Sequence, residues 1–105
     1  MELAYITSHA QQRMHERMGI KKKSSLRVAS LALMRGLKTE DTTGQLKWYA
    51  RSIFCKHETA NNIRIYNEKV FVFQDQLLIT VYSLPHKYRS TAVFCNQRKC
   101  HADVA

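Results

Sequence analysis

Long apolar runs are missing from this sequence. No stretch of the 105 residues approaches the length needed to cross a bilayer. The first residues, Met1 to Tyr5, are acidic and short of apolar length, so no secretory leader is readable there. Internal repeats and low-complexity segments are also missing. We therefore expect one folded domain in the cytoplasm, without membrane contact.

A paired set of cysteines is missing as well. Three cysteines are an odd number, which argues for thiols in a reducing compartment rather than a disulfide framework. Cys55 and His57, with Cys95, Cys100 and His101, hold enough soft ligands for tetrahedral zinc. Their spacing is not that of a recognised zinc knuckle. We therefore predict no metal and no cofactor, and these five residues are weak metal candidates only.

Acidic residues are scarce. Eight Asp and Glu stand against 17 Lys and Arg, which leaves a formal net charge of +9. Such an imbalance favours polyanionic partners, with nucleic acid first and an acidic protein second. It bears on partners and solubility, not on the fold.

The N-terminal half has the pattern of three helices. The first follows a cap at Thr7 or Ser8 and stops at Gly19; the second follows Ser24 or Ser25 and stops at Gly36. For residues 43–57 an alternating strand pattern competes with a helical one. The helical pattern has more matches, and Thr42 with Gln45 resembles a capping box, so we predict a helix.

The C-terminal half changes to a period of two. Residues 63–66, 69–73 and 77–82 form three apolar runs with short connections, which predicts an antiparallel meander. Residues 5–7 are a short first strand or only a lead-in, and residues 90–105 are a polar tail or an edge strand. The predicted fold is α+β, with about three helices packed on a three- to four-stranded antiparallel sheet over residues 1–89.

A basic stripe runs along the first predicted helix. His9, Arg13 and Arg17 recur every four residues, so their side chains share one face beside the packing stripe. An imidazole in line with two guanidiniums is suited to hold a phosphate. A solvated basic face is the alternative explanation of the same pattern.

The meander supplies two possible partners for this stripe. If both connections are two-residue turns, Arg64 lies across from Phe71 and Phe71 across from Thr80, all on one face. An arginine beside a hydroxyl on a sheet face is suited to bind an anion. A three-residue loop at Gln74 to Gln76 would reverse this register.

These residues resemble a known superfamily. The string His9-Ala10-x-x-Arg13-Met14-x-Glu16-Arg17, followed by a sheet ending in Leu78-Ile79-Thr80-Val81-Tyr82, is similar to small bacterial domains of the barnase, EndoU, colicin and RelE ribonuclease-toxin superfamily. The segment from Asn61 to Tyr66 also resembles small proteins of Gram-positive bacteria and their mobile elements. The resemblance covers roughly residues 5–85.

The resemblance implies a metal-independent endoribonuclease fold that holds RNA across its sheet. His9 would serve as base or acid, Arg13 and Arg64 would clamp the phosphate, and Thr80 would donate a hydrogen bond. The helical part of this chain is larger than the minimal form of the superfamily, and many members of such superfamilies bind without cutting.

A second set of basic and aromatic residues is suited to contact single-stranded RNA. These residues are Arg17, Lys21, Lys22, Lys23, Tyr66, Tyr82, Lys87 and Arg89. We therefore expect an RNA-interacting protein of the ribonuclease-toxin type, with an acidic protein or antitoxin as a possible partner. The alternative is a non-catalytic mobile-element inhibitor or binding protein that docks its basic face on an acidic protein or a nucleic-acid channel.

Overall fold

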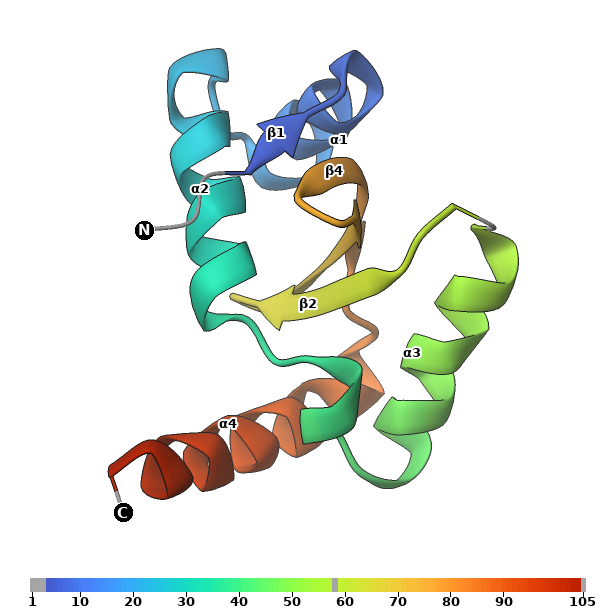
Figure 1. The fold of residues 1–105 in the computed structure, drawn as a ribbon, viewed down its shortest axis with the longest axis vertical. Helices are drawn as coiled ribbons and strands as arrows, with labels where there is room; N and C mark the ends of the chain where they lie inside the picture. The colour runs from blue at the N-terminus through green and yellow to red at the C-terminus, as the bar shows by residue number, and fades with distance from the viewer. Residues whose placement is uncertain (1–3, 58, 105) are drawn as a thin grey trace.

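The structure, a computed structural model, describes residues 4–57 and 59–104, without the side chains of Lys22 and residues 98–104. Within that part, the chain forms four α-helices and a four-stranded sheet. Figure 1 shows the helices arranged around the sheet. The elements are β1 (Tyr5–Ile6), α1 (Ser8–Met18), α2 (Lys22–Arg35), the 3-10 turn η1 (Thr39–Asp41), α3 (Gly44–Lys56), β2 (Asn62–Tyr66), β3 (Lys69–Gln74), β4 (Leu77–Ser83), the 3-10 turn η2 (His86–Tyr88) and α4 (Arg89–Val104). The predicted α+β class is confirmed.

Helix α1 is bounded by the signals that its sequence carries. The Thr7 hydroxyl accepts the backbone N–H of Ala10 at 3.0 Å, which satisfies one of the orphan donors of the first turn. Gly19 ends the helix in the left-handed conformation, with φ of 65°, and its N–H donates to the carbonyl of His15.

The other two predicted helices are confirmed, but their predicted caps are wrong. Helix α2 begins before Ser24, after Lys21, and the Ser25 hydroxyl donates back to the Lys21 carbonyl at 3.1 Å. Helix α3 begins after Thr43 without a side-chain cap, and the Thr42 hydroxyl donates to the Thr39 carbonyl instead. Ser25 thus bonds back to the N-cap residue within the first turn of α2, whereas Thr42 bonds to η1.

The sheet has the order β1-β4-β3-β2. The meander of β2, β3 and β4 is antiparallel as predicted, and β3 is buried on both faces. Residues 5–6 do form a strand, but β1 pairs with β4 in parallel, so the sheet is mixed rather than antiparallel. Strand β1 leads directly into α1, and α1 packs along β4.

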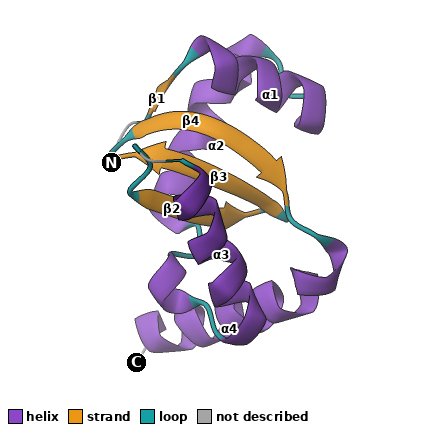
Figure 2. Ribbon diagram, turned by 90° about the vertical axis from the view of Figure 1, so that its right-hand side faces the viewer, coloured by secondary structure: helices purple, strands orange, loops and turns teal. Residues whose placement is uncertain are grey.

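Helices lie on both faces of the sheet, as Figure 2 shows. Buried side chains form two cores, one on each face. On one face, Phe71, Phe73 and Val81 pack against Met14 of α1 and Leu33 of α2, all at most 3% exposed. The opposite face packs against α3 and α4 through a second cluster. That cluster consists of Leu37, Leu46, Ile53, Ile63, Ile65, Val70, Val72, Leu84 and Cys95.

The segment predicted as a polar tail or an edge strand, residues 90–105, is helical over its described part, residues 90–104. Residues up to 104 belong to α4, and Ala92 and Cys95, three positions apart, pack into the second core. Val93 and Phe94 remain 55% exposed. Three consecutive apolar residues, Ala92 to Phe94, fit a short strand and a helix turn equally well, so periodicity alone could not decide between them.

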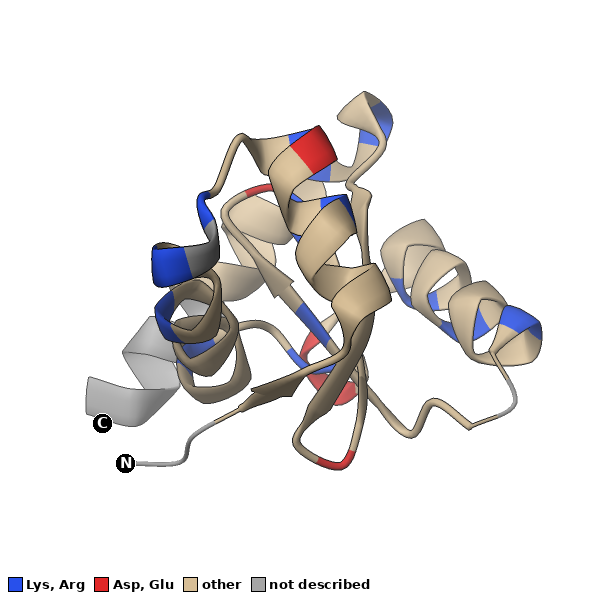
Figure 3. Ribbon diagram, turned by 90° about the horizontal axis from the view of Figure 1, so that it is seen from above, with Lys and Arg blue, Asp and Glu red and all other residues tan. Residues whose placement is uncertain are grey.

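The Lys and Arg positions are spread widely along the ribbon, while the Asp and Glu positions are confined to a few places (Figure 3). None of the described helices combines the length and the apolar character needed to span a membrane.

Candidate nucleic-acid interface

The basic stripe of α1 lies at the surface. His9 is exposed, and the Nε of Arg13 donates to its Nε2 at 3.5 Å. Arg13 also forms an ion pair with Glu16, at 2.9 Å between Nη1 and Oε2. A hydrogen bond from Gln12 lowers the pKa of Glu16, and Arg13 and Arg17 act in the same direction. Glu16 therefore stays ionised and offsets the charge of Arg13.

Arg17, the last residue of the stripe, crosses to strand β4. Strand β1 pairs only with the start of β4, so later carbonyls on that edge need other donors. The Nη1 of Arg17 donates to the carbonyl of Val81. Its guanidinium also lies over the ring of Tyr82, 5.2 Å from the centroid, in cation–π geometry.

Tyr82 has a second partner from the other side of the fold. The hydroxyl of Tyr82 lies 2.6 Å from Nε2 of His57, and the two ring centroids are 5.8 Å apart. His57 follows the last residue of α3, and its N–H donates to the Ile53 carbonyl. We call Arg17, His57 and Tyr82 the β4 cluster, because two helix ends meet on this strand.

Two more tyrosines continue from the β4 cluster. The rings of Tyr49 in α3 and Tyr88 in η2 lie 5.1 Å apart, and the Lys87 ammonium lies 5.1 Å from the Tyr88 ring centroid. Burial raises the pKa of Tyr49, and the neighbouring Tyr82 and Tyr88 raise it further, so its hydroxyl remains protonated. We call Tyr49, Lys87 and Tyr88 the aromatic arm.

The four residues predicted to be catalytic do not form one site. His9 and Arg13 are neighbours on α1, whereas Arg64 is directed to the end of α2. Its Nη1 donates to the Leu33 carbonyl at 2.6 Å, and its Nε donates to Asn62 at 2.9 Å. Arg64 thus satisfies a helix-end carbonyl, and the expected phosphate clamp of Arg13 and Arg64 is not observed.

Thr80 lies on the other face of the sheet from Arg64. The pairing of Arg64 with Phe71 is as predicted, but Phe71 pairs with Val81, and Thr80 pairs with Val72. The turn at Asp75 and Gln76 does have two residues; the register changes at a β-bulge, in which Ile79 is the extra residue of β4. The predicted phosphate pocket between Arg64 and Thr80 is therefore wrong.

The residues predicted to contact RNA divide into three places. Arg17, Tyr82 and Lys87 lie in the β4 cluster and the aromatic arm. Lys21 and Lys23 are exposed before and within α2, and the side chain of Lys22 is outside the described residues. Tyr66 and Arg89 line a separate hollow of about 520 Å³, where Arg89 lies 3.6 Å from Glu68.

The weak metal candidates are not assembled into a site by the described side chains. Cys55 is exposed, Cys95 is buried with its sulfur 3.8 Å from the Thr43 hydroxyl, and His57 contacts Tyr82. The side chains of Cys100 and His101 lie outside the described residues. Within the described part of the chain, no group of three His, Cys, Asp or Glu residues could hold a metal ion.

His57 and Tyr49 are the residues of the two clusters that the sequence did not place, whereas Lys87 was expected at an RNA surface. His57 ends a helix and Tyr82 lies in a strand 25 residues later, so no spacing rule joins them. For His57 the sequence offered only one weak signal, a histidine at the end of an amphipathic helix. Near the last strand it offered tyrosines beside basic residues. Comparisons of the chain with protein-family models, with curated proteins and with solved structures found no match.

Proposed function

We propose that the protein binds single-stranded RNA across the β4 cluster and the aromatic arm. The observation that carries the proposal is that one tyrosine, Tyr82, contacts a guanidinium from α1 and an imidazole from the end of α3. Aromatic rings interleaved with cations are how proteins hold unpaired bases and the phosphates between them. Tyr88 with Lys87 repeats this pairing on the neighbouring arm.

The net charge supports the same class of partner. A formal charge of +9 attracts a polyanion over the whole surface and makes the affinity depend on salt. Charge alone would also favour an acidic protein. The cluster of tilted aromatic side chains favours RNA, because unpaired bases offer faces against which aromatic rings can stack.

A second, catalytic function is favoured by the hydrogen bond between His57 and Tyr82. In metal-independent RNA cleavage the 2′-oxygen attacks phosphorus, and the bond from phosphorus to the 5′-oxygen breaks. We propose that the imidazole of His57 takes the 2′ proton and the hydroxyl of Tyr82 protonates the leaving 5′-oxygen. Arg17 stabilises the charge on the phosphorane while the 2′-oxygen attacks and the 5′-oxygen leaves. Afterwards His57 returns its proton to the Tyr82 oxygen through their hydrogen bond, which restores both groups.

Binding is tested with a fluorescently labelled single-stranded RNA and its anisotropy. We expect Arg17→Gln and Lys87→Gln each to weaken binding, and the matched Arg27→Gln, an exposed cation of α2, to change it little. An RNA duplex should bind less tightly, because its base faces are stacked inside the helix. An equal loss of affinity in all three variants would show that the RNA binds through non-specific charge and not at the β4 cluster and the aromatic arm.

Cleavage is tested on the same RNA with a chelator present. The expected products carry 2′,3′-cyclic phosphate and 5′-hydroxyl ends, and they should disappear in His57→Ala but not in His15→Ala, which removes an exposed histidine of α1. Intact RNA at saturating protein, or cleavage that survives His57→Ala, would reject the catalytic step and leave the binding function to be judged by anisotropy.

A further inference from the structure

A second basic hollow lies on the other flank of α3. It has a volume of about 360 Å³, is open to solvent and is lined by residues of η1, α3 and the start of β2. Small-molecule sites in proteins occupy about 300–1,000 Å³, so one nucleotide is within its capacity. We call it the α3 pocket.

The lining of the α3 pocket is cationic with an apolar wall. Lys38, Lys47 and Arg51 line it, against a single carboxylate, Glu40, which lies 3.8 Å from the Lys38 ammonium. Among the described residues, Lys47 has no acidic side chain within 4.0 Å. Cationic side chains that the fold itself does not neutralise are what a bound phosphate requires.

The other polar side chains of the pocket are of two kinds. The amides of Asn61 and Asn62 are engaged with the turn at Asp75, at 2.7–3.3 Å, so they shape the rim. The hydroxyl of Thr39 is buried and has no hydrogen-bond partner within the described part of the chain. An orphaned buried hydroxyl beside a basic hollow is unusual in a protein without a ligand there.

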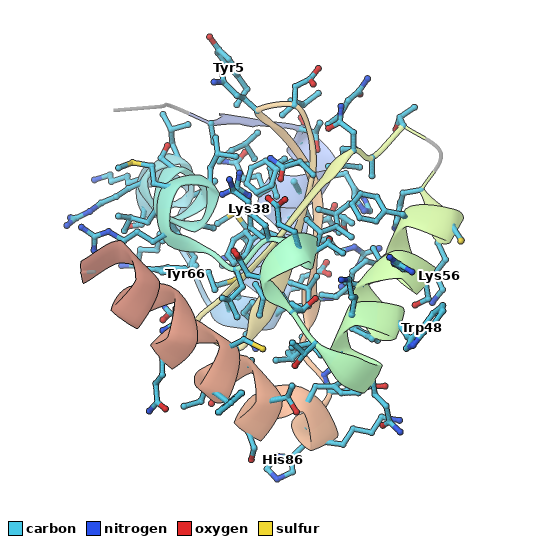
Figure 4. The ribbon with its side chains drawn as sticks, turned by 60° about the horizontal axis from the view of Figure 1, so that its bottom comes forward. Tyr5, Lys38, Trp48, Lys56, Tyr66 and His86 are labelled. Atoms are coloured by element: carbon cyan, nitrogen blue, oxygen red, sulfur yellow. The ribbon has the colours of Figure 1, made fainter. Side chains whose placement is uncertain are left out.

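Trp48 stands next to this pocket. It is 68% exposed, and the guanidinium of Arg51 lies over its ring at 5.4 Å from the centroid. In Figure 4, Trp48 and Lys56 project from α3 at the right of the view, while Lys38 lies near the centre. Arg51 therefore joins the pocket to an aromatic face open to solvent.

We propose that the α3 pocket binds the phosphate of one nucleotide of a single-stranded RNA and that the adjoining base stacks on Trp48. The proposal rests on the proposed RNA-binding function and extends its contacts around α3, because Tyr49 of the aromatic arm lies on the same helix. At 100° per residue, Tyr49 is on a different side of α3 from Lys47 and Arg51. The bound RNA would thus contact α3 on two sides, at the aromatic arm and at the α3 pocket.

Trp48 is the only tryptophan of the chain, so its emission reports this site alone. The probe is an oligouridylate of about ten nucleotides, within the range of single-strand sites. Anisotropy of the labelled oligonucleotide measures total binding, and quenching of Trp48 measures stacking. We expect both signals to follow the same titration curve.

Matched variants separate the pocket from general charge. Lys47→Gln and Arg51→Gln should each weaken binding about two- to fivefold and lower the slope of log affinity against log salt by about 0.7. Lys56→Gln removes one exposed cation that lies nine residues from Lys47, on the opposite side of α3, and should change binding less. Trp48→Ala should weaken it about fivefold or more, because one stacked base is lost.

The outcomes are distinct. An anisotropy change without quenching of Trp48, or a loss in Lys56→Gln as large as in Lys47→Gln, would overturn the α3 pocket and leave the RNA-binding function in place. No anisotropy change with the unaltered protein would overturn both. Gln has a helix propensity similar to that of Lys and Arg, and circular dichroism verifies that each variant is folded.

Discussion

Nε2 of His57 and the hydroxyl of Tyr82 lie 2.6 Å apart, and this contact joins the end of α3 to the end of β4. Both side chains are half-buried, so their hydrogen bond is partly shielded from water. The contact holds the ring of Tyr82 under the guanidinium of Arg17. It therefore has a structural role as well as the functional one proposed above.

Tyr82→Phe keeps the ring and removes only the hydroxyl. We expect the free energy of unfolding to fall by about 0.5–1.5 kcal/mol, the usual net value of one hydrogen bond, in urea denaturation. Tyr5→Phe, at a side chain that is 66% exposed, should leave stability unchanged. If Tyr82→Phe unfolds at the same urea concentration as the unaltered protein, the contact with His57 does not contribute to stability.

Arg64→Gln should reduce stability without affecting RNA binding. Its hydrogen bond to the Leu33 carbonyl is charge-assisted and lies at the negative end of the α2 dipole, so the expected loss is about 1.5–3 kcal/mol. Arg35→Gln removes the same charge from the exposed surface of the same helix and should cost little. A large loss of RNA affinity in a folded Arg64→Gln variant would contradict this prediction and would indicate that Arg64 contacts the RNA.

Gly36 permits a close approach between α2 and β2. A Cβ at this position would lie 2.5 Å from the Ala32 carbonyl oxygen and 2.8 Å from the Cβ of Arg64, so the backbone must move. We expect Gly36→Ala to destabilise the protein by about 1–3 kcal/mol, as overpacking does, measured by thermal or urea unfolding.

Gly19 is the contrasting case, because its φ is 65° and a Cβ at this position would meet no other atom within 4 Å. Gly19→Asn should be tolerated better than Gly19→Ala, since asparagine adopts the left-handed conformation more readily. At Gly36 neither residue should be tolerated. If Gly36→Asn were clearly more stable than Gly36→Ala, the backbone conformation of Gly36, and not crowding around it, would limit substitution at this position.

The raised pKa of Tyr49 predicts a loss of stability in alkali. The folded state holds its proton to higher pH than the unfolded state does, so stability is full below the ordinary tyrosine pKa of about 10 and falls as pH rises through the folded value. Tyr49→Phe should lessen this alkaline loss, followed by urea unfolding at successive pH values. An unchanged pH profile in Tyr49→Phe would assign the loss to other groups.

Much of the fold was predictable because its signals are local. The cap at Thr7, the stop at Gly19 and the change from helical to alternating periodicity after residue 60 all act within a few residues. Helix α4 was not predictable from this kind of signal. Its apolar residues are few and consecutive, and contacts of Ala92 and Cys95 with the second core decide that it packs there.

The candidate site was less predictable. Arg17 and Tyr82 were expected at a nucleic-acid surface and do meet, whereas Arg64 and Thr80 were expected together and lie on opposite faces. One inserted residue, Ile79, accounts for that difference, because side chains alternate along a strand and a bulge reverses every face beyond it.

The sequence by itself determined the α+β class, the basic charge, the helical stripe of His9, Arg13 and Arg17 and the antiparallel meander. These depend on composition and on periods of two and 3.6 residues. Only the tertiary structure decided which charges meet: it brought Arg17 and His57 to Tyr82 and directed Arg64 to the end of α2. The reason is physical, since the partner of a long side chain depends on the register of strands and the placement of helix ends, which arise from contacts between distant parts of the chain.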